Sequence, residues 1–199
     1  MKHINYTIAA IALLFISTFA IAQRVEVTDG SLDALKGIKK LNVKYDYSGM
    51  TVGKKSEKDY VDEKTDGFNK KEPGKGDKWA KDWKADREGR YEPTFEEGFN
   101  KNGDIQVGYN PKEKYTLIFK TVLTEPGFNI GVMRKSAYID GAAWIVETAD
   151  QSKVIAKMDV NKCPGRTIFG DDYDTGERIM EAYASAGRAL ARYLRKSTE

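Results

Sequence analysis

Histidine and cysteine are nearly absent from this sequence, and their scarcity excludes much of the chemistry that enzymes use. The chain has one histidine, His3, and one cysteine, Cys163, among its 199 residues. A Ser-His-Asp triad, a Cys-His dyad and a histidine-ligated zinc site each need a histidine in the folded protein. Since His3 would leave with the signal peptide described below, the chemistry that remains is that of carboxylates or of a Ser-Lys pair.

The lone cysteine also excludes a disulfide within the chain. We expect Cys163 to be a buried and inert thiol, because a free cysteine behaves as a small apolar side chain. An intermolecular disulfide or a reactive thiol is the alternative.

A long apolar run occurs only at residues 8–20, between the basic start of the chain and the small-residue sequence Ala20-Ile21-Ala22. This is the pattern of a secretory signal peptide, and the run is shorter than the roughly 20 residues that a membrane anchor needs. The residue directly after the predicted cleavage point is Gln23 and not a cysteine, so a lipid anchor is not expected. We therefore predict a signal peptide at residues 1–22 and an exported protein, periplasmic or secreted, at residues 23–199 without a further membrane span.

Neither sign of charge dominates. The chain has 33 Lys and Arg against 30 Asp and Glu, and the loss of Lys2 with the signal peptide leaves 32 against 30. The charges are interspersed along the chain instead of forming one block. Nucleic acid is therefore not an expected partner.

The strongest structural pattern is a pair of alternating apolar runs at residues 142–160. A polar turn at residues 149–152 separates the runs, so the pattern predicts a β-hairpin with one face turned to a core. An isolated hairpin is not stable in water, so other elements must pair with it and pack on it. The alternating positions are Ala142, Trp144, Val146 and Thr148 in the first run and Val154, Ala156, Met158 and Val160 in the second.

Other segments predict the rest of the domain. Residues 41–47 and 115–123 have the pattern of strands, the second of them central, while residues 24–37 are expected to be a loose lead-in. An apolar stripe predicts a final helix at residues 176–195 that covers the hairpin. We therefore predict a single α+β domain with a mostly antiparallel sheet, helices packed on one side, a C-terminal helix and a helical insertion at about residues 55–100. The stripe consists of Ile179, Tyr183, Ala186 and Leu190.

The helical insertion has two aromatic residues of interest. Ser56 followed by Asp59 resembles a capping box, and Asp77 is expected to cap the next helix. Trp79 and Trp83 stand four residues apart, so they face the same way and are expected to pack on the sheet. A sugar-stacking platform that they form with Tyr91 is the alternative.

Two loops allow more than one interpretation. Residues 127–131 form a glycine-bounded loop whose Phe128 and Ile130 are expected to tuck against the sheet edge, with a contact patch for a partner as the alternative. The aspartates of residues 169–177 are expected to begin the final helix, with Asp174 as its cap. Calcium binding there is the less favoured alternative, because the spacing does not match a twelve-residue calcium loop.

Two stretches resemble a known group of proteins. Residues 137–160, where the second strand closes with Lys157-Met158-Asp159, and residues 181–190 resemble an exported Bacteroidetes protein family of unknown function. Their layout is similar to the small α/β domains of envelope lipoproteins, such as the curli-export lipoprotein and the Tol amino-terminal domain. The inserted helices and the missing lipidation cysteine depart from those relatives. The resemblance implies a role in the cell envelope and no catalytic residue.

These observations favour an exported, non-enzymatic protein that binds a partner in the cell envelope, either a protein or a glycan. The alternatives are a hydrolase that works through two carboxylates, which leave no local sequence signature, and a structural, self-assembling envelope component. No catalytic, cofactor-binding or metal-binding residue is predicted, no cofactor is expected, and the oligomeric state stays open. The carboxylates that such a hydrolase could use are Glu96, Glu97, Asp140 and Asp172.

Overall fold

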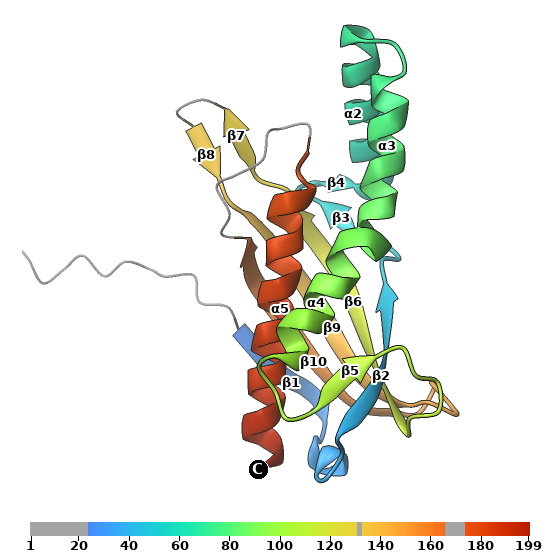
Figure 1. The fold of residues 1–199 in the computed structure, drawn as a ribbon, viewed down its shortest axis with the longest axis vertical. Coiled ribbons are helices and arrows are strands. Elements are labelled where there is room, and N and C mark those ends of the chain that lie inside the picture. Colours follow the sequence, from blue (N-terminus) through green and yellow to red (C-terminus); the bar gives the residue numbers. More distant parts are fainter. Residues whose placement is uncertain (1–23, 131–132, 166–173) are drawn as a thin grey trace, which may run out of the picture.

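The computed structural model describes residues 24–130, 133–165 and 174–199 (Figure 1). The predicted signal peptide, residues 1–22, lies outside these residues. Within them, the chain forms a mixed sheet, a separate two-stranded hairpin and a layer of helices. The strands are β1 (Arg24–Gly30), β2 (Lys40–Asp46), β3 (Thr51–Val52), β4 (Lys55–Ser56), β5 (Gln106–Gly108), β6 (Tyr115–Glu125), β7 (Phe128–Ile130), β8 (Met133–Lys135), β9 (Ala137–Glu147) and β10 (Val154–Gly165). The helices are η1 (Asp33–Leu35), α2 (Glu57–Lys71), α3 (Lys75–Asp86), η2 (Arg87–Tyr91), α4 (Glu92–Asn100) and α5 (Gly176–Thr198).

The main sheet has the strand order β1-β10-β9-β6-β2-β5. Neighbouring strands from β1 to β6 are antiparallel, whereas β2 is parallel to both β6 and β5. The parallel pairs arise because the chain crosses through helices α2 to α4 between β2 and β5. This arrangement confirms the predicted α+β class, with a mostly antiparallel sheet and a C-terminal helix. No helix in the described residues is both long and apolar enough to cross a membrane.

The predicted hairpin is present as β9 and β10, with β6 beside β9 at the centre of the sheet. The prediction that Ala142 and Trp144 of β9 face the core was wrong, whereas Val146 is buried as predicted. Ile145 pairs with Ala156 and Ala143 pairs with Met158, so these four side chains share the core face and Trp144 points away from it. Alanine occurs on both faces of β9, so the alternation of apolar residues did not identify the core face. The pairing of β9 with β10 identifies it.

Residues 24–30 are a strand, and the prediction of a loose lead-in there was wrong. β1 pairs antiparallel with β10, with Val25 opposite Val160 and Val27 opposite Met158. Both β1 valines are partly buried against the core. A single alternation of valines is too short to predict a strand by itself, so the pairing with β10 determines this element.

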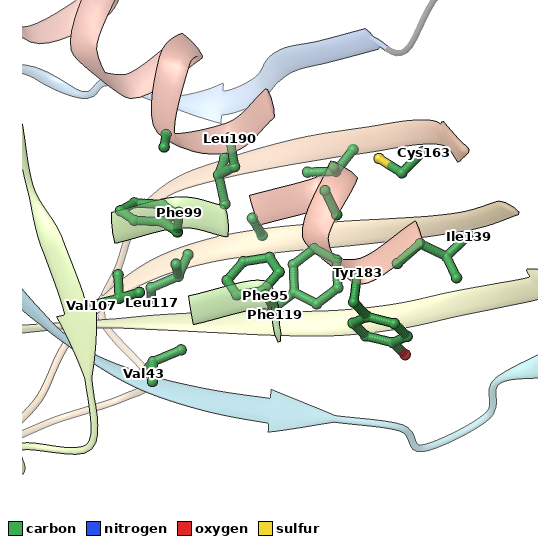
Figure 2. Packing of buried hydrophobic residues seen from close by; sticks show 14 of the residues in the cluster. Val43, Phe95, Phe99, Val107, Leu117, Phe119, Ile139, Cys163, Tyr183 and Leu190 are labelled. Atoms are coloured by element: carbon green, nitrogen blue, oxygen red, sulfur yellow. The ribbon is translucent and has the colours of Figure 1, made fainter. Parts of the chain in front are cut away.

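Helices α4 and α5 form the layer that covers the core face of the sheet. Phe95 and Phe99 of α4 and Leu190 of α5 are completely buried over the strands, as Figure 2 shows. The helices approach closely, since a Cβ atom placed on Gly187 would lie 2.2 Å from the carbonyl oxygen of Phe95. Cys163 is buried among the core residues, as predicted.

The helical insertion is a hairpin, α2 and α3, that continues through η2 into α4 (Figure 1). Ser56 caps α2 as predicted, because its hydroxyl accepts a hydrogen bond from the Asp59 amide at 3.1 Å. The predicted cap at Asp77 was wrong: α3 begins two residues earlier, after Gly74, which has a φ of +82° that favours glycine. The α2–α3 hairpin projects beyond one end of the sheet.

Candidate functional site

The carboxylates named from the sequence do not form a catalytic pair in the described residues. Glu96 accepts a hydrogen bond from the Tyr45 hydroxyl at 3.2 Å, and the neighbouring Glu97 is exposed and paired with Lys101. Asp140 lies on the sheet face that points away from the helices and accepts the Lys162 amide at 2.6 Å. Asp172 lies outside the described residues.

A half-buried group of tyrosines and glutamates lies where α4 crosses β2. The Tyr47 hydroxyl donates to Glu92 and the Tyr45 hydroxyl to Glu96, each at 3.2 Å. Burial raises the pKa of both glutamates above the ordinary value of 4.5. The nearest hollow, beside Tyr47, has about 10 Å³, which is about the space of one water molecule. This group can therefore fasten α4 to β2, but the hollow beside it has no room for a substrate.

The tryptophans of α3 do not form an open sugar-stacking platform. Trp79 and Trp83 are 3% and 4% exposed, and their rings stack on each other at 5.5 Å. They pack against Tyr60 and Phe68 of α2, and Trp83 also lines the small hollow that Thr124 of β6 borders. Tyr91 is likewise buried, stacked on a tyrosine of α5. With no ring face open to solvent, these residues hold the helical hairpin together.

A cavity of about 160 Å³ lies between α3 and the start of α5. Asp86 and Asp174, two of its three acidic lining residues, are bridged by the Arg90 guanidinium, with nitrogen-to-oxygen distances of 3.1 and 2.9 Å, and the third, Asp82, pairs with Lys78. Asp174 also accepts the Gly176 amide at 3.0 Å, but the N-cap of α5 is Thr175, so the prediction of Asp174 as the cap was wrong by one residue. In the part of the chain that the structure describes, no group of acidic or cysteine side chains is placed to hold a metal ion.

A second, more open hollow of about 360 Å³ lies at the opposite side of the domain, beside β5. Its exposed lining residues include Tyr109, which is 81% exposed. The amides that line this hollow are engaged in loop contacts: Gln106 donates to the Asn100 carbonyl and Asn110 donates to Glu113. These contacts hold the turn between β5 and β6 in place. The two amides are therefore not directed together at a ligand in the hollow.

The feature with the clearest capacity for binding is the hairpin formed by β7 and β8. Its strands pair only with each other, in a two-stranded sheet separate from the main one. Ile130 and Met133 lie opposite each other at its end and are 56% and 60% exposed. Exposed apolar side chains at the end of a projecting element are typical of an interaction surface.

The base of this hairpin is firmly held. Gly127, with a φ of +64°, lies so close to the opposite strand that a Cβ atom there would be 2.2 Å from the Lys135 carbonyl oxygen. The Glu125 carboxylate accepts the Gly127 amide at 3.2 Å and pairs with the Lys135 ammonium at 2.7 Å. The buried Arg178 of α5 donates to the Pro126 carbonyl at 3.2 Å. The hairpin is therefore a fixed projection whose apolar end extends into solvent (Figure 1).

Basic groups follow the apolar pair along β8. Arg134 is exposed and has no carboxylate partner within the described part of the chain, and Lys135 is exposed behind it. The order from the end of the hairpin toward its base is thus apolar, then cationic, with the Glu125–Lys135 ion pair at the base. We call Ile130, Met133 and Arg134 the hairpin tip.

Sequence reasoning located part of this site. It identified residues 127–131 and the contact-patch alternative, but expected the loop to tuck against the sheet edge. The structure places Phe128 and Ile130 in a strand that leaves the sheet, with Ile130 exposed. Met133 and Arg134 were missed, because only the pairing of β7 with β8 brings them beside Ile130.

Comparisons with known proteins yield structural matches alone. No family model and no curated protein matches the chain. The chain is similar to the solved PelC dodecamer from Paraburkholderia phytofirmans, at 12% identity and a TM-score of 0.44, over 87% of this chain and 98% of that one. A variant of the same dodecamer matches at 10% identity and a TM-score of 0.36, over 84% of this chain and 99% of that one.

Proposed function

We propose that this is an exported, non-enzymatic protein that docks on a component of the cell envelope through its hairpin tip. The observation that carries the proposal is the exposure of Ile130 and Met133 on a projection with a rigid base. Export rests on the signal-peptide pattern of residues 1–22.

The connection between β6 and β9 supports a binding role for the hairpin. These strands are antiparallel neighbours, with Glu125 opposite Tyr138, so a turn of a few residues could join them. The chain instead runs outward through β7 and back through β8. Ile130 and Met133 add nothing to the hydrophobic core, which is formed by other residues. An extension that exposes apolar side chains without contributing to the core is best explained by a contact with another surface.

The non-enzymatic part of the proposal rests on how the carboxylates are used. Glu92 and Glu96 are engaged by tyrosine hydroxyls, Glu97 and Asp140 by lysines. Among the described residues, none of these four carboxylates lines one of the three cavities described above. Binding therefore accounts for the surface better than carboxylate hydrolysis does.

The test is fractionation of bacteria that export the full-length protein. We expect wild type to sediment with the envelope, and the double variant Ile130→Ser, Met133→Ser to stay in the soluble exported fraction. Val154→Ser is the matched control: Val154 is 40% exposed and begins β10, at the opposite end of the sheet from the hairpin. Equal sedimentation of wild type and the double variant, with both folded, would overturn the proposal.

A further inference from the structure

We infer that the surface on which the hairpin tip docks is a bilayer that contains anionic phospholipid. The inference rests on the proposed function and names the component of the envelope. It follows from the length of the hairpin, from the order of its apolar and cationic side chains, and from the backbone N–H and C=O groups at its outer edges.

The length of the hairpin matches the depth of a membrane interface. Each strand has three residues, which at about 3.3 Å per residue span roughly 10 Å. Apolar groups of interfacial proteins enter about 5–10 Å into the boundary between headgroups and acyl chains. Ile130 and Met133 can therefore reach this boundary while the base of the hairpin and the sheet stay in water.

The order of side chains matches the order of layers in a lipid surface. Arg134 comes directly after Met133, so it lies at the level of the phosphates when the apolar pair reaches the acyl chains. The acid at the base of the hairpin, Glu125, is already paired with Lys135, which offsets its charge. The exposed Arg134 therefore makes the hairpin tip complementary in charge to anionic headgroups.

The backbone of the hairpin limits how deeply it can enter. Within the described residues, β7 and β8 are paired with each other and not with the main sheet, so the backbone N–H and C=O groups on their outer edges lie outside the ladder of the main sheet. Such groups are not tolerated in hydrocarbon but can bond to headgroups and interfacial water. The hairpin is therefore an interfacial anchor and not a spanning element.

The small size of the tip makes the binding weak and dependent on salt. Two partly exposed apolar side chains bury less area than one myristoyl chain, which by itself gives an association constant of about 10⁴ M⁻¹. The electrostatic contribution of Arg134 is screened within a Debye length, which is about 8 Å at 0.15 M salt. We therefore expect reversible binding that weakens as salt is added.

The experiment is sedimentation of the purified exported protein with vesicles of phosphatidylcholine alone or of phosphatidylcholine and phosphatidylglycerol in equal parts. We expect binding to the mixed vesicles, at least about tenfold weaker binding to the neutral ones, and release by salt. The Ile130→Ser, Met133→Ser variant should lose the binding at least about tenfold. Arg134→Gln should weaken it severalfold and flatten its salt dependence, whereas Val154→Ser should bind as wild type does.

The outcomes separate this inference from the proposed function. If no vesicle binds while envelope sedimentation still depends on Ile130 and Met133, the lipid inference is overturned and a protein or glycan is the partner. Equal binding to both kinds of vesicle also overturns it, because the anionic component is then irrelevant. Thermal unfolding of every variant at the wild-type midpoint ensures that a loss of binding reflects the tip and not the fold.

Discussion

Individual glycines set how closely α4 can approach α5. A Cβ atom on Gly187 would lie 2.2 Å from the Phe95 carbonyl oxygen, and one on Gly98 would lie 2.5 Å from the Ala184 carbonyl oxygen. Both contacts are with backbone atoms, which cannot rotate away as a side chain can. The helices must therefore separate if either glycine acquires a side chain, and the phenylalanines beneath them lose contact with the sheet.

We predict that Gly187→Ala destabilises the protein by about 1–3 kcal/mol, the usual range for overpacking in a dense core. The matched control is Gly67→Ala, at an exposed position of α2 where a Cβ atom meets nothing within 4 Å. That substitution should stabilise by about 0.5–1 kcal/mol, because alanine loses less backbone entropy in a helix than glycine does. Urea denaturation of both variants measures the two effects, and an unchanged midpoint for Gly187→Ala would contradict the packing described.

Two neighbouring glutamates of α4 should respond to pH with opposite signs. Burial raises the pKa of Glu96 above 4.5, so the folded state favours its protonated form. The resulting stabilisation is complete below pH 4.5 and is lost as the pH rises through the folded-state pKa. The hydrogen bond from Lys101 lowers the pKa of Glu97, so its contribution is present above pH 4.5 and is lost on acidification.

We therefore predict that Glu96→Gln raises the urea midpoint at neutral pH, and that the gain shrinks as the pH falls through the raised folded-state pKa to 4.5. Glutamine resembles the protonated acid, and its carbonyl oxygen can still accept the Tyr45 hydroxyl. Glu97→Gln should instead lower the midpoint slightly at neutral pH, with the difference vanishing in acid. A gain for Glu96→Gln that persists unchanged in acid would show that its cause is not ionisation.

At the scale of elements, the α2–α3 hairpin is stabilised by its own aromatic contacts. No residue of α2 is fully buried, and the helix packs on α3 through Tyr60 and Phe68, which contact Trp79 at 6.0 and 5.8 Å. An isolated helix of this length is marginal in water. The stability of α2 therefore depends on the tryptophans of α3 more than on the sheet.

We predict that Trp79→Ala loosens α2 locally while the sheet keeps its stability. Truncation of a buried aromatic typically removes about 3–5 kcal/mol, which is enough to open a helix held mainly by that contact. Hydrogen exchange should show faster exchange for the amides of α2 and unchanged exchange for those of β6. Trp144→Ala, on the sheet face away from the helices, is the control and should leave the exchange of α2 unchanged. Uniform acceleration through α2 and β6 would show that the hairpin and the sheet unfold as one unit.

At the scale of the molecule, side chains close both edges of the main sheet. The Tyr193 hydroxyl of α5 accepts the Val27 amide of β1 at 3.3 Å. At the other edge, the Asn100 amide side chain bonds to both the N–H and the C=O of Val107, at 2.7 and 2.9 Å. Closed edges disfavour pairing with strands of other chains. At Val27 and Val107 the two edges are therefore less available to a strand of another chain.

The helix α5 covers the core and also bonds to the edge strand β1. We predict that a chain ending before Thr175 does not fold cooperatively. It would lose the buried Ile179, Tyr183 and Leu190, and would uncover the edge of β1. A chain ending after Leu194 keeps every buried residue of this helix and should unfold with a single urea transition. Near-ultraviolet circular dichroism distinguishes the two, because only a packed core orders the aromatic rings. A native-like spectrum from the shorter chain would contradict this role of α5.

The sequence by itself determined those elements whose signals are local. The β9–β10 hairpin, the Ser56 cap and the apolar stripe of α5 follow from contacts two to four residues apart, which a single sequence displays. The tertiary structure alone decided which face of β9 is buried, that residues 24–30 form a strand, and that Trp79 packs on α2. It also decided the candidate site, since Met133 and Arg134 join Ile130 only when β7 and β8 pair away from the sheet. Each of these depends on register between segments, and a one-residue change of register reverses every side chain of a strand while leaving the sequence pattern the same.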